Sequence, residues 1–274
     1  MKDPQTVQAG IPGVLPRLRS GEVTVLGPFA VPELAPRLVR VYLPRGFTPE
    51  APTPGRGGNP SRGALWLFDG QNVFDDGPSF AGGWHAHEAV ERLAKAGRPA
   101  PVIIGIDHGG ESRIYELSPF EWEGKPGQLA MLLGWITGAL MPVLQAELGL
   151  PTGPAGAVIG GSSMGGLAAL WCHFHAPHVF GGALAMSPAL WLAGQTIFAD
   201  LAAQPDPETS RIYLDMGVRE EKGRMIPIAA ALAAQLTARG WSADRLMWRP
   251  DAKGSHNETC WRRRLPKALR FLYR

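Results

Sequence analysis

The feature that most constrains this chain is an alternation of short apolar runs with helical stretches. Five runs are apolar on both faces of an extended backbone, which is typical of strands in a parallel sheet covered by helices. They are residues 64–68, 102–106, 156–160, 182–186 and 211–215. The predicted helices are residues 84–97, 127–148, 164–176, 224–239 and 257–273. This alternation predicts an α/β fold with a mostly parallel central sheet and helices on both faces.

The first part of the chain has a different pattern. Residues 22–26 and 38–43 alternate apolar and polar side chains, so we expect an antiparallel opening pair of strands. Residues 1–20 are expected to be an N-terminal extension, and the Pro- and Gly-rich residues 49–63 a flexible loop. No internal repeat or domain boundary is recognisable, so residues 1–274 are predicted to form one domain.

The charge and the cysteines argue against several classes of protein. The formal net charge is +3, and the densest basic run, residues 262–264, lies in an amphipathic stretch, so no nucleic-acid partner is expected. Cys172 and Cys260 are the only cysteines, and their spacing fits neither a zinc site nor a disulfide framework. Nothing in the sequence indicates an oligomeric state.

Membrane insertion and export are also not expected. The longest apolar candidate, residues 129–150, is interrupted by Pro142 and Gln145, and no apolar run reaches about 18 residues. The first residues carry no secretory pattern. The sequence therefore predicts a cytoplasmic protein without a membrane partner.

A nucleophile motif follows the third strand of the parallel set. Gly161, Ser163 and Gly165 fit G-x-S-x-G, with an apolar strand directly before and an Ala/Leu-rich helix directly after. The motif needs glycines because the serine stands on a sharp strand-to-helix turn, where a Cβ would crowd the neighbouring backbone. The five-residue pattern alone is weak, but its context favours Ser163 as a nucleophile over a plain Gly-rich turn.

A nucleophilic serine needs a base and an orienting acid, and in α/β-hydrolases these follow the serine in the order acid, then histidine. His256 lies in a turn-rich loop before the last helix, which suits a general base. The other histidines after the serine crowd its helix, and we expect them at the surface or at helix ends; they are His173, His175 and His178. Glu220, just beyond the strand 211–215, is the favoured acid, and Asp215 at the strand end is the alternative.

The oxyanion of acyl transfer needs two backbone N–H groups. The amide of Met164, directly after the nucleophile, is one candidate, and the amide of Gln71, in the loop after strand 64–68, is the other. Two short segments rich in acidic residues or histidines could suggest a metal site, but neither has the spacing of a complete ligand set, so we expect no metal. These segments are Asp75–Asp76 and His85-Ala-His87-Glu88.

Several segments together resemble the putative-esterase family of α/β-hydrolases. They are Phe68-Asp-Gly-Gln-Asn-Val-Phe-Asp-Asp, Gly105-Ile-Asp-His-Gly-Gly-Glu-Ser-Arg, Tyr115-Glu-Leu-Ser-Pro, Gly160-Gly-Ser-Ser-Met-Gly-Gly, Ser187-Pro-Ala-Leu-Trp, Tyr213-Leu-Asp-Met-Gly-Val-Arg-Glu and Gly254-Ser-His-Asn-Glu-Thr-Cys-Trp. The resemblance spans about residues 35–273, in order. That family includes esterase-D-like enzymes, enterochelin esterases, feruloyl esterases and mycolyltransferases. The resemblance implies a Ser163–His256–Glu220 mechanism on a small-molecule ester, without metal or organic cofactor.

The sequence says less about the substrate. Trp84, Trp122 and Trp191 lie on or near strand-end loops and could form an apolar or sugar-stacking wall, although core packing is an equal alternative for each. Arg113 could bind a polar substrate, but we favour a pair with Glu116 that braces the loop. Two rivals to an esterase stay open: a non-catalytic carbohydrate- or partner-binding module on this fold, and an acyltransferase or peptidase that uses the same triad.

Overall fold

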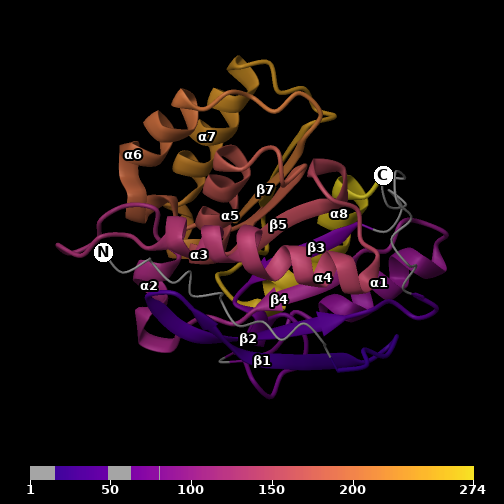
Figure 1. Ribbon diagram of the computed structural model, residues 1–274. Helices are drawn as coiled ribbons and strands as arrows, with labels where there is room; N and C mark the ends of the chain where they lie inside the picture. The colour runs from indigo at the N-terminus through magenta and orange to yellow at the C-terminus, as the bar shows by residue number, and fades with distance from the viewer. Residues whose placement is uncertain (1–15, 49–62, 80) are drawn as a thin grey trace, which may run out of the picture.

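The computed structural model describes residues 16–48, 63–79 and 81–274 (Figure 1). The predicted extension 1–20 and loop 49–63 therefore lie outside the described residues, apart from 16–20 and residue 63. The described chain contains one sheet of eight strands in the order β1-β2-β4-β3-β5-β6-β7-β8. The strands are β1 (Val23–Val31), β2 (Leu34–Tyr42), β3 (Ala64–Phe68), β4 (Val102–Ile106), β5 (Ala157–Ser162), β6 (Gly182–Met186), β7 (Arg211–Gly217) and β8 (Leu246–Asp251).

The strand directions confirm the mostly parallel sheet. β1 pairs antiparallel with β2, and β2 pairs antiparallel with β4, as expected for the opening pair. From β4 to β8 every neighbouring pair is parallel. The central strands β3, β4, β5 and β6 are buried along their whole length, which explains why their sequences are apolar on both faces.

Helices cover both faces of the sheet. Alternate side chains of β3 show the two layers, since Trp66 joins one apolar cluster and Leu65 joins the other. The Trp66 face carries α3 (Leu129–Trp135), η4 (Ile136–Leu140), α4 (Met141–Leu148), α5 (Met164–His175), α6 (Leu190–Ala203) and α7 (Ile226–Ala238). The Leu65 face carries α1 (Ala86–Lys95) and α8 (Glu258–Leu272), which pack against each other. In Figure 1, α3, α4 and α5 pass in front of the strands.

The predicted helix 127–148 is confirmed as one continuous stretch, Leu129–Leu148, but the expectation that no apolar run reaches about 18 residues was wrong. Pro142 does not interrupt the stretch, because the backbone widens into the π-helical turn η4 just before the proline and the helix continues. Residues Leu129–Leu148 are, by length and composition alone, long and apolar enough to cross a membrane, with a mean hydropathy of 1.6. The stretch packs on the sheet here, and 44% of its most apolar window is buried. The cytoplasmic location stays a prediction.

Helix α6 was not predicted from the sequence. It begins within the Ser187-Pro-Ala-Leu-Trp segment, which looks like a loop, and Gly194 interrupts it with φ 50° and ψ −133°. The break shifts the helical phase midway, so no single 3.6-residue pattern spans the element. Because α6 starts next to the end of β6, it brings its first residues to the edge where the parallel strands end. That edge carries the candidate site.

Candidate active site

Ser163 stands on the turn between β5 and α5 that the sequence motif predicts. Its backbone has φ 54° and ψ −121°, a strained conformation for a residue with a side chain. A Cβ on Gly161 would lie 2.6–2.8 Å from the backbone of Gly165, so the turn needs glycine at 161, and a Cβ on Gly165 would lie 3.1 Å from Phe68 Cβ. The amide of Ser163 donates to the carbonyl of Met186 on the neighbouring strand, 3.0 Å away. These contacts hold the serine at the end of the sheet.

His256 and Glu220 line up behind that serine. The Nε2 atom of His256 lies 2.9 Å from Ser163 Oγ, and its Nδ1 atom lies 2.8 Å from Glu220 Oε2. The His256 side chain is 44% exposed, whereas that of Glu220 is 1% exposed. The structure thus brings together the three residues predicted for catalysis, from the ends of β5, β7 and β8. The histidine therefore faces solvent, whereas the glutamate behind it is buried.

The loop that carries His256 and the loop that carries Glu220 pack closely against each other. A Cβ on Gly217, at the end of β7, would lie 2.5 Å from both the Gly254 carbonyl oxygen and Glu220 Oε1. The amide of Val218 donates to the carbonyl of Asp251 and that of Arg219 to the carbonyl of Gly254, each at 2.9 Å. The distance between acid and base is therefore set by backbone contacts between the two loops.

The carboxylate of Glu220 is fixed at both oxygens. Its Oε1 atom accepts hydrogen bonds from the Gly217 amide at 2.9 Å and from the Ser187 hydroxyl at 2.6 Å, which leaves Oε2 for His256. Burial by itself raises the pKa of Glu220, but the hydrogen bonds from His256 and Ser187 outweigh burial and hold the pKa below its ordinary value. Glu220 is therefore an ionised carboxylate with a defined orientation.

The alternative acid, Asp215, lies behind this line and does not reach the histidine. Its side chain is fully buried, and its Oδ1 atom accepts from the Ser187 amide and forms an ion pair with Arg264 Nη1, both at 3.0 Å. Burial raises the pKa of Asp215 to about 7, and the Arg264 charge opposes that shift. The geometry thus favours Glu220 over Asp215 as the partner of His256.

The other histidines after the serine were expected at the surface or at helix ends. His173 lies in the last turn of α5, but it is fully buried there, with its ring against Trp241 and Phe174. Burial lowers the pKa of His173 to about 4, which keeps the ring neutral. His175 does lie near the helix end, where Nε2 is 2.9 Å from Asp200 Oδ2. Because α5 has apolar residues on nearly all sides, it is packed on nearly all sides, and His173 is buried with them although its side chain is polar.

The loop of the second oxyanion donor candidate lies against the nucleophile turn. The 3-10 helix η2 (Gly70–Asn72) follows β3, and a Cβ on Gly70 would lie 2.5 Å from the carbonyl carbon of Gly105 in β4. Asp69 Oδ2 would lie 3.2 Å from a Cβ on Gly165, which places this loop next to the start of α5. Met164 opens α5, and the first amides of a helix have no acceptor within it. The roles of Met164 and Gln71 stay predictions.

Of the tryptophans suggested for the substrate pocket, Trp84 is corrected and Trp191 stays a prediction. Trp84 is only 2% exposed and packs against Trp261 between α1 and α8, so it lines no pocket. Trp191 is 52% exposed and makes an edge-to-face contact with Trp122, with ring centroids 5.8 Å apart. The positions of the tryptophans near strand ends do not show which of them is buried. The direction of each side chain depends on the face of the sheet that its loop crosses.

The expected pair between Arg113 and Glu116 is also wrong. Arg113 binds both oxygens of Asp69, with Nε–Oδ1 2.6 Å and Nη2–Oδ2 2.7 Å. Glu116, on the short helix α2 (Arg113–Glu116), pairs instead with the buried Arg37 of β2 at 2.6 Å. Arg113 keeps a partly exposed side chain (29%) beside the η2 loop. Its partner is a residue far away in sequence, which local spacing does not indicate.

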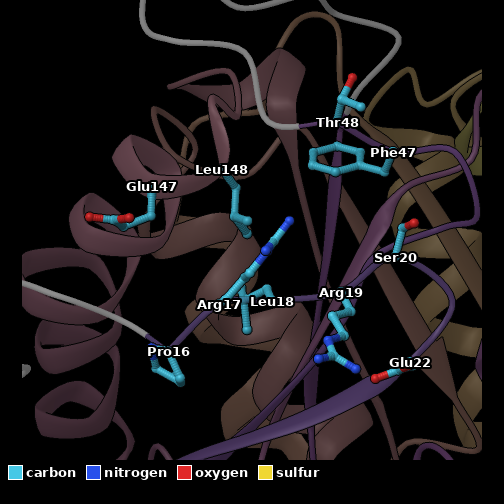
Figure 2. A pocket seen from close by; sticks show the side chains of 10 residues that line it. All are labelled: Pro16, Arg17, Leu18, Arg19, Ser20, Glu22, Phe47, Thr48, Glu147 and Leu148. Carbon is cyan, nitrogen blue, oxygen red and sulfur yellow. The ribbon is translucent and has the colours of Figure 1, made fainter.

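The described residues contain no group of three or more His, Cys, Asp or Glu side chains that could hold a metal ion. The suspected segments have other partners, since His85 Nε2 lies 2.8 Å from Asp76 Oδ1 and its Nδ1 lies 3.1 Å from Glu88 Oε1. A hollow of about 760 Å³ lies near the start of β1 and the end of α4, and Figure 2 shows the side chains that line it. None of the Ser–His–Glu residues lines it. It is lined by Pro16, Arg17, Leu18, Arg19, Ser20, Glu22, Phe47, Thr48, Glu147 and Leu148.

Comparison with known proteins places this chain in a family. A family model described as "Putative esterase" matches residues 35–272. The iron(III) enterobactin esterase of Escherichia coli K12 is 30% identical over 137 residues, which are 47% of this chain and 33% of that protein. This chain thus spans only about a third of that relative's length.

Solved structures show the same fold over nearly the whole chain. The BES protein of Bacillus cereus matches with a TM-score of 0.70 and 20% identity, over 97% of this chain and all of that chain. A siderophore hydrolase, EstA of Aspergillus nidulans, matches with a TM-score of 0.67 and 19% identity, over 94% and 97%. The family match covers most of the chain, and the structural matches confirm the fold. The chain therefore belongs to the putative esterase family and is a carboxylic ester hydrolase with the α/β-hydrolase fold.

Proposed function

We propose that Ser163, His256 and Glu220 form the catalytic triad of this esterase and that it acts through an acyl-enzyme. The observation that carries the proposal is the unbroken line of two hydrogen bonds, 2.9 Å from Ser163 Oγ to His256 Nε2 and 2.8 Å from His256 Nδ1 to Glu220 Oε2. Nucleophile, base and orienting acid within hydrogen-bond reach are the signature of this chemistry.

The reaction proceeds in two acyl-transfer steps. His256 Nε2 takes the proton of the Ser163 hydroxyl while Oγ attacks the ester carbonyl carbon, and the carbonyl oxygen becomes an oxyanion. When the tetrahedral intermediate collapses, the bond to the alcohol breaks and His256 returns the proton to the leaving alcohol oxygen. Water then gives a proton to His256 and attacks the acyl group, and the carboxylic acid leaves as Ser163 recovers its proton.

Glu220 supports the charge that this cycle places on the imidazole. His256 becomes a cation whenever it holds the serine proton, and the buried carboxylate beside Nδ1 stabilises that cation. Because the pKa of Glu220 lies below its ordinary value, the carboxylate does not take the proton itself. The ring of Trp261 meets the imidazole edge-to-face, with centroids 5.0 Å apart, and limits its rotation. The base is thus held in the tautomer that accepts a proton at Nε2.

The oxyanion is proposed to bind the backbone amides of Met164 and Gln71. The position of Met164 at the first residue of α5 supports its role, because its N–H points out of the helix start, where the dipole favours negative charge. The close packing of η2 on β4 and on the nucleophile turn supports the role of Gln71. Such donors lower the barrier by about 3 kcal/mol each.

The proposed substrate is a small ester with an aromatic or otherwise flat portion. Trp191 is exposed and lies two residues after Ala189, whose amide donates to the Ser163 carbonyl at 2.9 Å, so the backbone that leads to this indole starts at the nucleophile turn. Together with Trp122 it offers an aromatic surface on which a ring can stack. The relatives named for enterobactin and siderophore hydrolysis make siderophore esters the first natural class to test.

The test is hydrolysis of p-nitrophenyl acetate, butyrate and octanoate by the wild type and by Ser163→Ala. We expect turnover by the wild type and its loss in the variant. Ser210→Ala, at the opposite end of β7, removes a buried hydroxyl outside the proposed triad and should keep full activity. A fluorophosphonate that labels the wild type but not Ser163→Ala would identify the nucleophile directly. A folded wild type that neither turns over these esters nor takes the label would refute the proposal and favour a binding module.

Hydrolysis and acyl transfer differ in the molecule that accepts the acyl group, so a second assay compares acceptors. Adding a simple alcohol or amine to the assay lets it compete with water for the acyl-enzyme. An esterase should release mainly the free acid, whereas an acyltransferase or peptidase-like enzyme should form the new ester or amide in preference to the acid. The half-exposed His256 side chain favours water as the acceptor, since solvent reaches the base.

A further inference from the structure

A buried hydroxyl behind the triad has its proton direction fixed by its neighbours. Ser187 follows β6, is 1% exposed and has a φ of 42°. Its Oγ atom lies 2.6 Å from Glu220 Oε1, 3.1 Å from Trp261 Nε1 and 2.9 Å from Arg264 Nη2. Indole and guanidinium nitrogens only donate hydrogen bonds, so they occupy the two lone pairs of the hydroxyl. The single hydroxyl proton then has one acceptor, Glu220.

The guanidinium that points at this hydroxyl is itself fixed. Arg264, on α8, is 6% exposed, and its Nη1 atom lies 3.0 Å from Asp215 Oδ1. The same Oδ1 accepts the backbone N–H of Ser187 at 3.0 Å. Arg264 Nη2 lies 3.8 Å from Glu220 Oε1, so one cation is shared between two buried carboxylates. A buried cation with this many polar neighbours has essentially one position.

We propose that Ser187 and Arg264 are positioning residues for the acid of the triad, an inference that rests on the function proposed above. Arg264, anchored by Asp215, holds the Ser187 hydroxyl so that its proton goes to Glu220 Oε1. With Oε1 occupied by Ser187, the carboxylate can rotate little, and Oε2 stays on His256 Nδ1. Neither residue touches the reacting atoms.

The composition of this cluster argues for a role beyond packing. Replacing buried ion pairs with apolar groups of similar volume is often neutral or stabilising, so stability alone does not require a charged cluster here. The cluster also contacts the base directly, because Trp261 donates to Ser187 and packs its ring against His256. The histidine and the acid are thus oriented from one shared set of side chains.

The first test removes the hydroxyl. In Ser187→Ala, Glu220 Oε1 loses one of its two donors, and we expect kcat to fall about 10- to 100-fold with KM changed less than about threefold, since small misplacements of catalytic groups have effects of this size. The Nδ1 proton of His256, hydrogen-bonded to a carboxylate, should give a low-field proton NMR signal that broadens or moves upfield in this variant. Ser210→Ala should change neither. Wild-type kcat together with an unchanged low-field signal in a folded Ser187→Ala would overturn the proposal.

A second variant separates positioning from folding. Arg264→Met alone leaves Asp215 buried without its cation and could fail to fold, so we pair it with Asp215→Asn, which removes the charge on both sides. The double variant should fold and should show the same loss in kcat and the same change in the His256 signal as Ser187→Ala. A folded double variant with wild-type kcat and signal would overturn the role of Arg264. The NMR signal needs no substrate, so it tests the positioning even if the proposed esterase reaction fails.

Discussion

The two sides of the nucleophile are built differently. On the acid side, at the ends of β7 and β8, the carboxylates are almost completely buried and each has a defined partner. On the substrate side, at the ends of β3 and β4 and the start of α6, Arg113 and Trp191 are partly exposed. The acid side must hold one geometry for every substrate, whereas the substrate side can vary with the ester. Activity should therefore be more sensitive to small changes on the acid side.

The sharpest test of that difference is Glu220→Gln. The Gly217 amide and the Ser187 hydroxyl both donate to Oε1, so the amide oxygen of the glutamine must take that place. Its NH2 group then faces His256 Nδ1 and forces the proton onto Nε2, which can no longer accept the serine proton. We expect kcat to fall about 10,000-fold, as for other triads held in the wrong tautomer.

Steady-state kinetics on p-nitrophenyl butyrate, with circular dichroism to confirm folding, would check this prediction. Asp215→Asn serves as the comparison, because Asp215 does not touch His256, and its loss in kcat should be at least tenfold smaller than that of Glu220→Gln. If Asp215→Asn were the more damaging change, the acid would have been assigned to the wrong carboxylate.

The two carboxylates should also have opposite effects on stability as the pH changes. The pKa of Asp215 is raised in the folded protein, from 3.8 to about 7, so between these values the folded state keeps a proton that the unfolded chain has lost. The stability of the wild type therefore falls relative to Asp215→Asn as the pH rises from about 4 to about 7, by up to a few kcal/mol.

For Glu220 the sign is reversed. Its pKa is lowered in the folded protein, so its ionised form stabilises the fold above the ordinary pKa of 4.5, and this contribution is lost as the pH falls through the folded value. Urea unfolding of the wild type, Asp215→Asn and Glu220→Gln at several pH values would measure both trends. Parallel stability curves for the wild type and Asp215→Asn would show that Asp215 does not titrate in this range.

A backbone change on the acid side should disturb both loops together. A Cβ on Gly217 would meet Glu220 Oε1 and the Gly254 carbonyl, each at 2.5 Å, so Gly217→Ala must push the acid away from the histidine loop. We expect a loss of about 1–3 kcal/mol in unfolding free energy and at least a tenfold lower kcat. Gly134→Ala, in α3 with no atom within 4 Å of the added methyl, should be neutral or slightly stabilising in urea unfolding. Equal effects of the two variants would contradict the close approach of the loops.

The sequence predicts the acid side of the site better than the substrate side, for a physical reason. Ser163, His256 and Glu220 follow from the required order of the triad and from the meeting of parallel strand ends at one edge, which the apolar runs reveal. The Arg113–Asp69 pair and the burial of Trp84 depend on which way a side chain points after the chain has folded. Residue spacing carries no such information.

The same limit applies to the elements and to the buried network. The buried parallel strands were predicted within one or two residues, but α6 was missed because Gly194 breaks its periodicity. His173 was expected at the surface or at a helix end, and the pattern of its helix does not indicate that the last turn of α5 is fully buried. The contact of Ser187 with Arg264 joins residues 77 positions apart, and no local motif indicates it.

The smallest effect is expected at Trp191, on the substrate side. Its indole is 52% exposed and contacts Trp122, so Trp191→Ala removes aromatic surface without opening a core cavity. We expect KM for an aromatic ester to rise about fivefold, the worth of one stacking contact, while kcat for p-nitrophenyl acetate and the melting temperature stay within error. Trp84→Ala is the matched control, since the same deletion in the core should cost about 3–5 kcal/mol of stability. If Trp191→Ala lowered kcat for every ester equally, this indole would support the nucleophile turn, and the division between a rigid acid side and an adaptable substrate side would be wrong.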